Sequence, residues 1–288
     1  MGRTALHRTR PAPARTNEAD SLSTGRSICH VIDGWRSFGA VQALAGVDID
    51  IRSGELLGIV GPNGSGKTTL FNCITGRFRL SRGRVLWNGK DITRWSTDRI
   101  ARAGLVRTFQ QSMSFGTGTV RDNVTMALDI ARAARHPERQ TSIPGDVEGL
   151  LEFTNLQVLA DTSSAVLSHG SLRKLGIALA LAVHPVLLLL DEPAAGLNNA
   201  ESGELASLLR KVRKSGVTLV VVDHDMGFLM PLVDRVVVLS AGRKLREGTP
   251  SEVRTDPSVI EAYLGSGFNR EPLPGPGPSA TAPGEIVG

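Results

Sequence analysis

A phosphate-binding loop is predicted by the run Gly61-Pro-Asn-Gly-Ser-Gly-Lys67-Thr68, which fits G-x-x-x-x-G-K-[ST] at every fixed position. Its glycines let the backbone curl, so that successive N–H groups point inward at phosphate oxygens. Lys67 would supply a mobile cation for the β- and γ-phosphates, and the Thr68 hydroxyl can bind Mg²⁺. A plain glycine-rich turn before a helix is the alternative, and the Lys-Thr pair argues against it.

Two adjacent carboxylates, Asp191 and Glu192, follow the apolar run Leu187–Leu190. Neighbouring residues on a strand point in opposite directions, so the two acids should have separate roles. One can reach Mg²⁺, directly or through water, while the other faces the γ-phosphate and orients the attacking water. The alternative for an isolated Asp-Glu pair is solvent exposure, but a buried strand before it favours hydrolytic chemistry.

The elements that must position these residues alternate between strand and helix. Nearly continuous apolar runs of strand length are typical of parallel strands that are covered on both faces. Such runs occur at Leu56–Val60, Val186–Leu190, Val217–Val222 and Arg235–Leu239. Helical patterns separate the runs, and residues 69–75 can form a helix directly after the phosphate loop. The order predicts an α/β domain with a largely parallel sheet.

Three further patterns complete the expected folded region. Val47–Ile51 alternates and a turn follows at Ser53-Gly54, which predicts a hairpin leading into the first buried strand. Val85–Trp87 followed by Asn88-Gly89 predicts another strand and a tight turn. The stretch from Val120 to about Val183 has a mostly helical pattern.

The composition limits the possible classes of protein. The chain has 288 residues, a hydrophobic content of 41% and a formal net charge of +5, which suit a globular protein with a basic surface. Its two cysteines, Cys29 and Cys73, make neither a disulfide framework nor a zinc site, so we expect free thiols in a reducing compartment. We find no secretory signal. The most apolar stretch is interrupted at His184-Pro185, so it is shorter than a helix that spans a bilayer.

The two ends of the chain differ from the rest. Residues 1–26 are rich in Arg, Ala, Pro, Thr and Ser without periodicity, which predicts a disordered basic arm. Residues 266–288 are rich in Pro and Gly, which predicts a disordered tail. We therefore expect one folded domain over residues 27–265.

The phosphate loop and the Asp191-Glu192 pair, with the segments described next, make the chain resemble the ATP-binding-cassette (ABC) family over about residues 28–265. Phe109-Gln110 resembles the family's glutamine loop, which implies that Gln110 contacts Mg²⁺ and the γ-phosphate. Leu167-Ser-His-Gly170-Ser171 resembles the signature motif, usually LSGGQ, at the start of a helix. The resemblance implies that Ser168 and the Gly170 backbone meet the γ-phosphate of ATP bound to the opposite subunit.

Three other segments carry the resemblance. His224, after Val220-Val-Val-Asp, resembles the switch histidine that reaches the γ-phosphate. Gly196-Leu-Asn198 resembles the loop that contacts the partner subunit. Phe38 resembles the aromatic residue that stacks on adenine, although a core aromatic, or Trp35 nearby, is the alternative.

The resemblance thus assigns a full set of site residues. The predicted catalytic residues are Glu192, His224 and Gln110. The predicted Mg²⁺ ligands are Thr68, Gln110 and Asp191. The predicted nucleotide contacts are Gly61, Pro62, Asn63, Gly64, Ser65, Gly66, Lys67, Thr68, Thr69, Phe38, Ser168 and Gly170.

The family also implies an architecture and partners. The fold would be an α/β P-loop NTPase (RecA-like) core with a mainly parallel sheet, an antiparallel β subdomain and an α-helical subdomain at about residues 111–184. The chain would bind ATP and Mg²⁺ as half of a homo- or heterodimer with a second ABC ATPase subunit. It would energise integral membrane permease subunits at the cytoplasmic face of the cell membrane, and indirectly serve a solute-binding protein, with no nucleic acid expected.

Several departures and branch features leave alternatives open. Asn198 stands where Asp is more common in the family. Ser171 stands where the family usually has Gln, and this departure alone supports one alternative, a regulatory subunit that binds ATP without hydrolysing it. Stretches such as Val106–Gln110 and residues 191–198 resemble the ATPases of branched-chain amino acid importers. The Leu-Ser-His-Gly run at Leu167 also occurs in urea and short-chain amide importers, which are the rival. A nucleic-acid-associated ABC ATPase is the alternative of another class.

Overall fold

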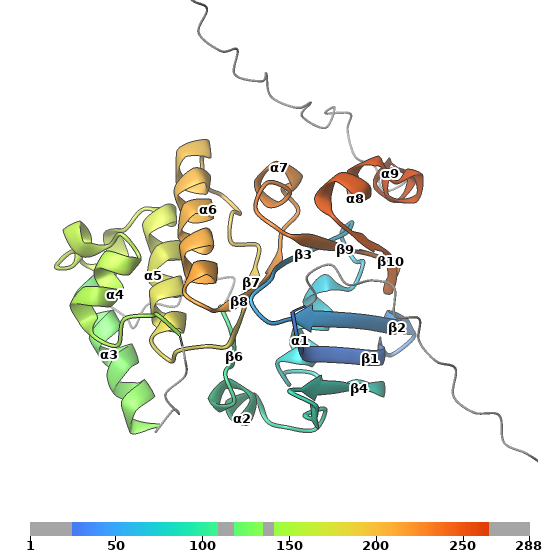
Figure 1. Cartoon of the computed structure of the whole chain (residues 1–288), viewed down its shortest axis with the longest axis horizontal. Coiled ribbons are helices and arrows are strands. Elements are labelled where there is room, and N and C mark those ends of the chain that lie inside the picture. The colour runs from blue at the N-terminus through green and yellow to red at the C-terminus, as the bar shows by residue number, and fades with distance from the viewer. Residues whose placement is uncertain (1–24, 109–117, 135–140, 265–288) are drawn as a thin grey trace, which may run out of the picture.

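The computed structural model describes residues 25–108, 118–134 and 141–264 as two sheets flanked by helices (Figure 1). The larger sheet has six strands in the order β10-β9-β3-β8-β7-β6. Five of them are parallel, and only β10 runs antiparallel to its neighbour β9. The strands are β3 (Leu56–Val60), β6 (Leu105–Arg107), β7 (Leu187–Asp191), β8 (Thr218–Val222), β9 (Arg235–Ser240) and β10 (Arg243–Gly248).

The parallel strands are covered on both faces, which confirms the prediction drawn from their apolar runs. In β3, Leu57 and Ile59 pack into a core shared with the second sheet, whereas Leu56 and Val60 pack against the helical side. β7 alternates in the same way. A strand that buries both faces needs apolar residues at successive positions, because its side chains point alternately to each face.

The smaller sheet is antiparallel, in the order β2-β1-β4-β5. The predicted tight turn between β4 and β5 is confirmed, because Asn88 and Gly89 have φ of 47° and 78°. The predicted hairpin at Ser53-Gly54 is wrong, since β2 pairs with β1 while β3 pairs with β8 and β9 in the other sheet. The strands are β1 (Ser27–Phe38), β2 (Val41–Arg52), β4 (Arg82–Trp87) and β5 (Lys90–Asp91).

Helices fill the space between the sheets and cover one side of the molecule. Side chains of α1 join the core that the two sheets share, so this helix lies between them. α3, α4, α5 and α6 form a helical layer on the left of Figure 1. The helices are α1 (Lys67–Ile74), α2 (Thr97–Arg102), α3 (Val120–Ala133), α4 (Val147–Phe153), α5 (His169–Leu181), α6 (Asn199–Lys214), α7 (Met226–Leu229), α8 (Pro250–Thr255) and α9 (Pro257–Leu264), with 3₁₀ turns at Gln157–Leu159 and Ser164–Val166.

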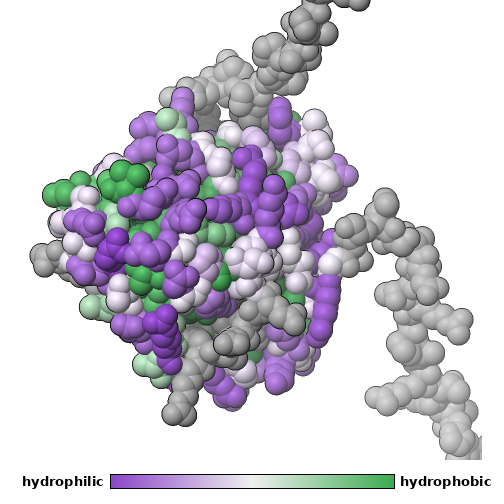
Figure 2. Space-filling model, turned by 60° about the vertical axis from the view of Figure 1, so that its left-hand side comes forward, coloured by the Kyte–Doolittle hydropathy of each residue, from purple (hydrophilic) through white to green (hydrophobic). Residues whose placement is uncertain are grey.

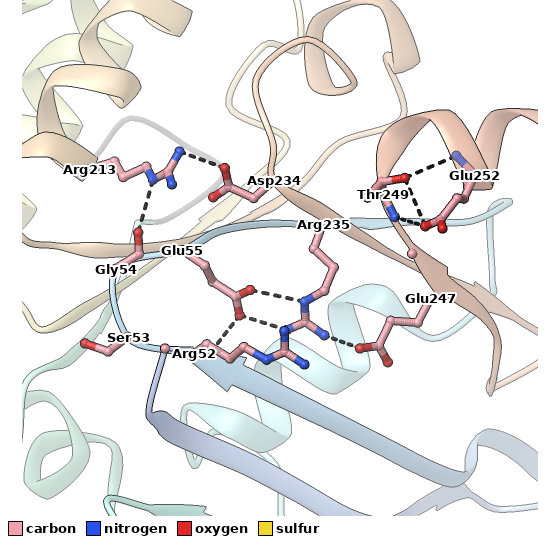
Figure 3. A pocket seen from close by; sticks show the side chains of 12 residues that line it. Arg52, Ser53, Gly54, Glu55, Arg213, Asp234, Arg235, Glu247, Thr249 and Glu252 are labelled. Atoms are coloured by element: carbon pink, nitrogen blue, oxygen red, sulfur yellow. Dashed lines mark hydrogen bonds and ion pairs between the residues drawn. The ribbon is translucent and has the colours of Figure 1, made fainter. Parts of the chain in front are cut away.

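The parallel arrangement gives the large sheet two chemically different edges. β3, β6, β7 and β8 all end at one edge, which we call the carboxyl edge, and the predicted phosphate loop and acids follow directly from it. The opposite edge, which we call the amino edge, contains a cavity of about 740 Å³ lined by charged side chains (Figure 3). Its buried Arg235 bonds to Glu55 and Glu247.

Two expectations from composition can be compared with the described part of the chain. Cys29 and Cys73 are free and buried, and burial raises their pKa to about 12 and about 11. Among the helices that the structure describes, none combines the length and apolarity required to cross a bilayer. Residues 1–24 of the predicted arm at 1–26, and the whole predicted tail at 266–288, lie outside the described residues.

Candidate nucleotide-binding site

The phosphate loop joins the end of β3 to the start of α1 and requires glycine at two positions. Gly61 has a φ of +150° and Gly66 a φ of +105°. A Cβ on Gly61 would lie 2.1 Å from the carbonyl oxygen of Leu239, and a Cβ on Gly66 would lie 2.5 Å from that of Ala43. Any side chain there would push the loop away from the backbone of β9 or β2.

The Lys67 ammonium is enclosed by this loop. It is 7% exposed and donates to the carbonyl oxygens of Gly61 at 2.6 Å and Pro62 at 3.0 Å. Burial lowers the pKa of Lys67, while the negative charges of Glu192 and Asp191 oppose that shift. The loop therefore holds a cation beneath its own backbone, within electrostatic reach of both acids that end the neighbouring strand.

The first turn of α1 offers backbone donors to an anion. Gly66 occupies the N-cap position, no side chain of the described residues caps this end, and the first turn contains no acid. Thr68 is exposed in this turn and Thr69 is half-buried. Because a helix N-terminus carries free N–H groups and a partial positive charge, the turn fits a phosphate group.

Asp191 ends β7 with a side chain that is fully buried. Its Oδ2 accepts a hydrogen bond from Nη2 of Arg107 at 2.5 Å, whereas its Oδ1 has no partner among the described residues. Burial raises the pKa of Asp191, and the charge and hydrogen bond of Arg107 oppose that shift. A buried carboxylate oxygen without a donor requires a water or a cation, so this atom fits the predicted Mg²⁺ ligand.

Glu192 lies in a different environment from its neighbour Asp191. Its side chain is 33% exposed, and its Oε1 lies 4.0 Å from Nδ1 of His224. Its backbone has a φ of +47°, in the left-handed region that costs a residue with a side chain about 1–3 kcal/mol. The Glu192 N–H donates to the carbonyl of Val222 at 2.7 Å, which fixes this strained position beside β8.

A buried acid, Asp223, builds the turn that presents His224. Asp223 accepts hydrogen bonds from the N–H of Ala194 at 3.1 Å and of Asp225 at 3.0 Å. Burial raises its pKa, and these hydrogen bonds oppose that shift. The His224 side chain is 58% exposed and next to Glu192, so the end of β8 presents an imidazole where β7 presents a carboxylate.

The predicted signature turn begins α5, as the sequence predicts. Ser168 is its N-cap and accepts a hydrogen bond from the N–H of Ser171 at 3.2 Å. The N–H of Gly170 donates to Oε1 of Glu201 at 3.2 Å. Glu201 also closes a capping box with Asn198 at the start of α6. Of the two departures from the family pattern, Asn198 caps α6 with its side chain, and the Ser171 hydroxyl accepts a hydrogen bond from Oγ of Ser168 at 3.3 Å.

The remaining predicted residues are less closely tied to this site. Phe38 is 40% exposed, with the ring of Phe78 edge-on at 5.2 Å and the guanidinium of Arg36 4.5 Å from its centroid. Stacking of Phe38 on adenine stays a prediction. Gln110 lies outside the described residues, together with Phe109.

The structure thus brings one group of predicted residues together and sets another apart. Lys67, Asp191, Glu192 and His224 meet at the carboxyl edge, whereas Ser168 and Gly170 bond within the helical layer. Sequence reasoning missed three residues that organise these groups, namely Arg107, Asp223 and Glu201. The only local signal for Asp223 is an acid directly after a buried strand, and the partners of the other two are distant in sequence.

Comparisons with known proteins agree with this geometry. The family model described as "ABC transporter" matches residues 44–195, and one described as "Branched-chain amino acid ATP-binding cassette transporter" matches residues 243–269. A relative from Pseudomonas aeruginosa, the high-affinity branched-chain amino acid transport ATP-binding protein BraF, is 37% identical, over 79% of this chain and 94% of its own length.

Solved structures give the same result. The ADP conformation of an ATP-binding cassette of an ABC transporter superposes with a TM-score of 0.73 at 30% identity, covering 83% of this chain and 99% of that one. A dimeric cassette in a post-hydrolysis state with ADP and Pi superposes with a TM-score of 0.65 at 25% identity, covering 77% and 99%. The chain belongs to the ABC transporter family and is one of its ATP-binding cassettes.

Proposed function

We propose that this chain is the ATP-hydrolysing subunit of an importer for branched-chain amino acids. The observation that carries the proposal is the match of residues 243–269 to the branched-chain family model, joined to a phosphate site with an enclosed lysine. The printed name of BraF, a branched-chain amino acid transport ATP-binding protein, supports the same solute class.

The residues of the carboxyl edge would share the chemistry of hydrolysis. Lys67 and the first-turn N–H groups of α1 would bind the β- and γ-phosphates, while Asp191 and Thr68 would hold Mg²⁺ with Gln110. The bound Mg²⁺ would neutralise phosphate charge. Glu192 would accept a hydrogen bond from the attacking water and orient it toward the γ-phosphate. His224, held by the turn of Asp223, would contact the γ-phosphate.

The site would be completed by a second cassette, in a homo- or heterodimer. Ser168 and Gly170 would meet the γ-phosphate of ATP bound to the other subunit, as the family resemblance implies. Their hydrogen bonds within one chain run to Ser171 and Glu201, away from this chain's own phosphate loop. The dimeric post-hydrolysis cassette among the structural relatives supports such an arrangement.

The helical layer offers a surface for the integral membrane permease subunits. Met126 and Ile130, one turn apart on α3, are 46% and 51% exposed. Figure 2 shows hydrophobic areas among hydrophilic ones on the side of the molecule where this layer lies. Contact there would place the chain at the cytoplasmic face of the membrane, and would couple it indirectly to a solute-binding protein.

The alternatives have less support. A subunit that does not hydrolyse ATP is supported by one departure only, Ser171, while Lys67, Asp191, Glu192 and His224 are all present. A nucleic-acid-associated ATPase with zinc-binding cysteines is disfavoured, because Cys29 and Cys73 are both free and buried. Urea and short-chain amides remain the rival solutes, which the transport experiment distinguishes.

Reconstitution tests this proposal. The chain and its permease subunits would be placed in vesicles with ATP inside, together with the solute-binding protein and labelled leucine or urea outside. We expect ATP-dependent uptake of leucine, and ATPase activity that the permease stimulates. Uptake of urea alone would contradict the solute class, and stimulation by DNA or RNA in place of the permease would contradict the transporter function.

A further inference from the structure

Arg107, the last residue of β6, ties three elements together beneath the phosphate site. Its side chain is 13% exposed. Nη2 donates to Oδ2 of Asp191 on β7 at 2.5 Å, and Nη1 donates to Oδ1 of Asn72 on α1 at 2.6 Å. The guanidinium therefore connects the strand before the glutamine-loop segment to the predicted Mg²⁺ ligand and to the helix that follows the phosphate loop.

The arrangement divides the Asp191 carboxylate between two uses. Oδ2 is taken by the guanidinium, whereas Oδ1 is buried and has no partner among the described residues. A guanidinium is planar and its donors diverge at fixed angles, so it sets the orientation of a carboxylate as well as its charge. The orientation of Oδ1, the atom left for Mg²⁺, thus depends on Arg107.

Stability alone does not account for this pair. Burying two charges carries a desolvation penalty that their attraction often fails to exceed. The Nε of Arg107 is also buried without a partner among the described residues, which adds to the penalty. An apolar pair would fill the same space without these costs, which points to a role in binding.

Contacts beside Arg107 reinforce the link between β6, β7 and α1. Thr108, which follows it, donates its N–H to the carbonyl of Leu189 on β7 at 2.9 Å. Asn72, the other partner, is 8% exposed on α1, the helix that begins with Lys67 and Thr68. One side chain thus holds the ligand-bearing strand against the helix that carries the other predicted ligand.

We propose that Arg107 is a positioning residue of the magnesium site, which orients Asp191 so that its second oxygen faces the cation. The proposal rests on the proposed function, because it assumes that nucleotide and Mg²⁺ bind at the carboxyl edge. Outer partners of metal ligands change metal affinity by about 10–100-fold when they are lost. Lysine keeps the charge but not the fork, so it should substitute poorly.

The test measures nucleotide binding without hydrolysis, on the full chain. A fluorescent ATP analogue would be titrated in EDTA and then over a range of Mg²⁺ concentrations, for wild type, Arg107→Lys and Arg107→Met. We expect the affinity in EDTA to change less than about twofold. The Mg²⁺ concentration for half-maximal enhancement should rise about 10-fold or more in both variants.

Two further variants keep the test decisive if Arg107→Met does not fold. Asn72→Ala removes the acceptor of Nη1 of Arg107 and leaves the bond between Arg107 and Asp191 in place. This variant should raise the Mg²⁺ requirement by a smaller factor. Arg235→Met removes an arginine of similar side-chain exposure, 11% against 13%, at the amino edge, and should leave the Mg²⁺ requirement unchanged in the folded protein.

Three outcomes would overturn the proposal. A folded Arg107 variant with the wild-type Mg²⁺ requirement would exclude positioning. A lower requirement would mean that the guanidinium competes with the cation. An equal loss of affinity in EDTA would mean that Arg107 acts on the nucleotide itself. If wild type bound no nucleotide with Mg²⁺, the proposed function would fail instead, so the two failures are distinguishable.

Discussion

Two buried arginines lie at opposite edges of the same sheet, and they differ in how completely they are hydrogen-bonded. Arg235, at the start of β9, bonds to Glu55 through Nε and Nη2 and to Glu247 through Nη1 (Figure 3). Its Nη2 also donates to the Asp50 carbonyl. Arg107, at the end of β6, leaves its Nε without a partner among the described residues.

The partners of the two arginines differ in the same way. Both Glu55 oxygens accept from Arg235, and Glu247 also bonds to Lys244. The Asp191 carboxylate, in contrast, uses one oxygen and leaves the other buried. A closed network such as that of the amino edge holds elements together, here β9, β10 and the start of β3. An open network at a strand end has capacity for a ligand.

The largest effect is expected at the open edge, from Glu192→Gln. The amide keeps the size of the side chain but is a poor acceptor for the proton of the attacking water, so turnover should fall by about 10²–10⁴-fold. Nucleotide affinity and the melting temperature should stay close to wild type. The measurements are steady-state phosphate release, nucleotide titration and thermal unfolding. Turnover at the parent rate would remove Glu192 from the proposed role.

At the closed edge, Arg235→Met should change stability without changing chemistry. Removing Arg235 leaves the charge of Glu55 uncompensated and Glu247 with Lys244 alone, and breaking a buried ion pair in this way costs about 3–5 kcal/mol. The exposed Arg94→Met is the control and should stay within about 0.5 kcal/mol of wild type. Denaturant unfolding measures both. The comparison of the edges fails if Arg235→Met lowers turnover per folded molecule while the free energy of unfolding is unchanged.

A smaller effect should appear in the pH dependence of stability. Burial alone would raise the pKa of Glu247, but Lys244 and Arg235 together lower it from its ordinary value of 4.5. The unfolded chain then binds this proton more readily, so the stabilisation is present above pH 4.5 and is lost as pH falls through the folded-state pKa.

Wild type should consequently lose more stability than Glu247→Gln on acidification from about pH 6 to about pH 4. Urea unfolding at several pH values measures the difference between the two slopes. Parallel slopes would show that Glu247 does not titrate with folding, and that the amino-edge network is weaker than its geometry indicates.

Local sequence patterns predicted the parts of this fold that depend on short-range geometry. The apolar runs predicted β3, β7, β8 and β9, whereas the start of α5 was expected from the resemblance of residues 167–171 to the signature motif. Which strands pair with one another was harder to predict from the sequence. β2 and β3 are joined by only three residues, yet they enter different sheets, because β1 pairs with β2 while β8 and β9 flank β3.

The candidate site divides in the same way. The phosphate loop and Asp191-Glu192 were predictable, since each is a contiguous run after a buried strand. Arg107 was not, because its partners Asn72 and Asp191 lie 35 and 84 residues away. Glu201 was missed for the same reason, since its carboxylate reaches Gly170 across 31 residues. Contacts between distant residues depend on the packing of whole elements, which no local pattern specifies.

Magnesium-dependent nucleotide binding is the most direct test of the claim that the carboxyl edge binds ATP. A fluorescent ATP analogue would be titrated against wild type and Lys67→Ala, with Mg²⁺ and with EDTA. Wild type should bind at or below about millimolar nucleotide and more tightly with Mg²⁺, whereas Lys67→Ala should lose about 10-fold or more, the value of a hydrogen bond to a charged group. Equal affinity in the two proteins, or no binding by wild type with Mg²⁺, would contradict the account.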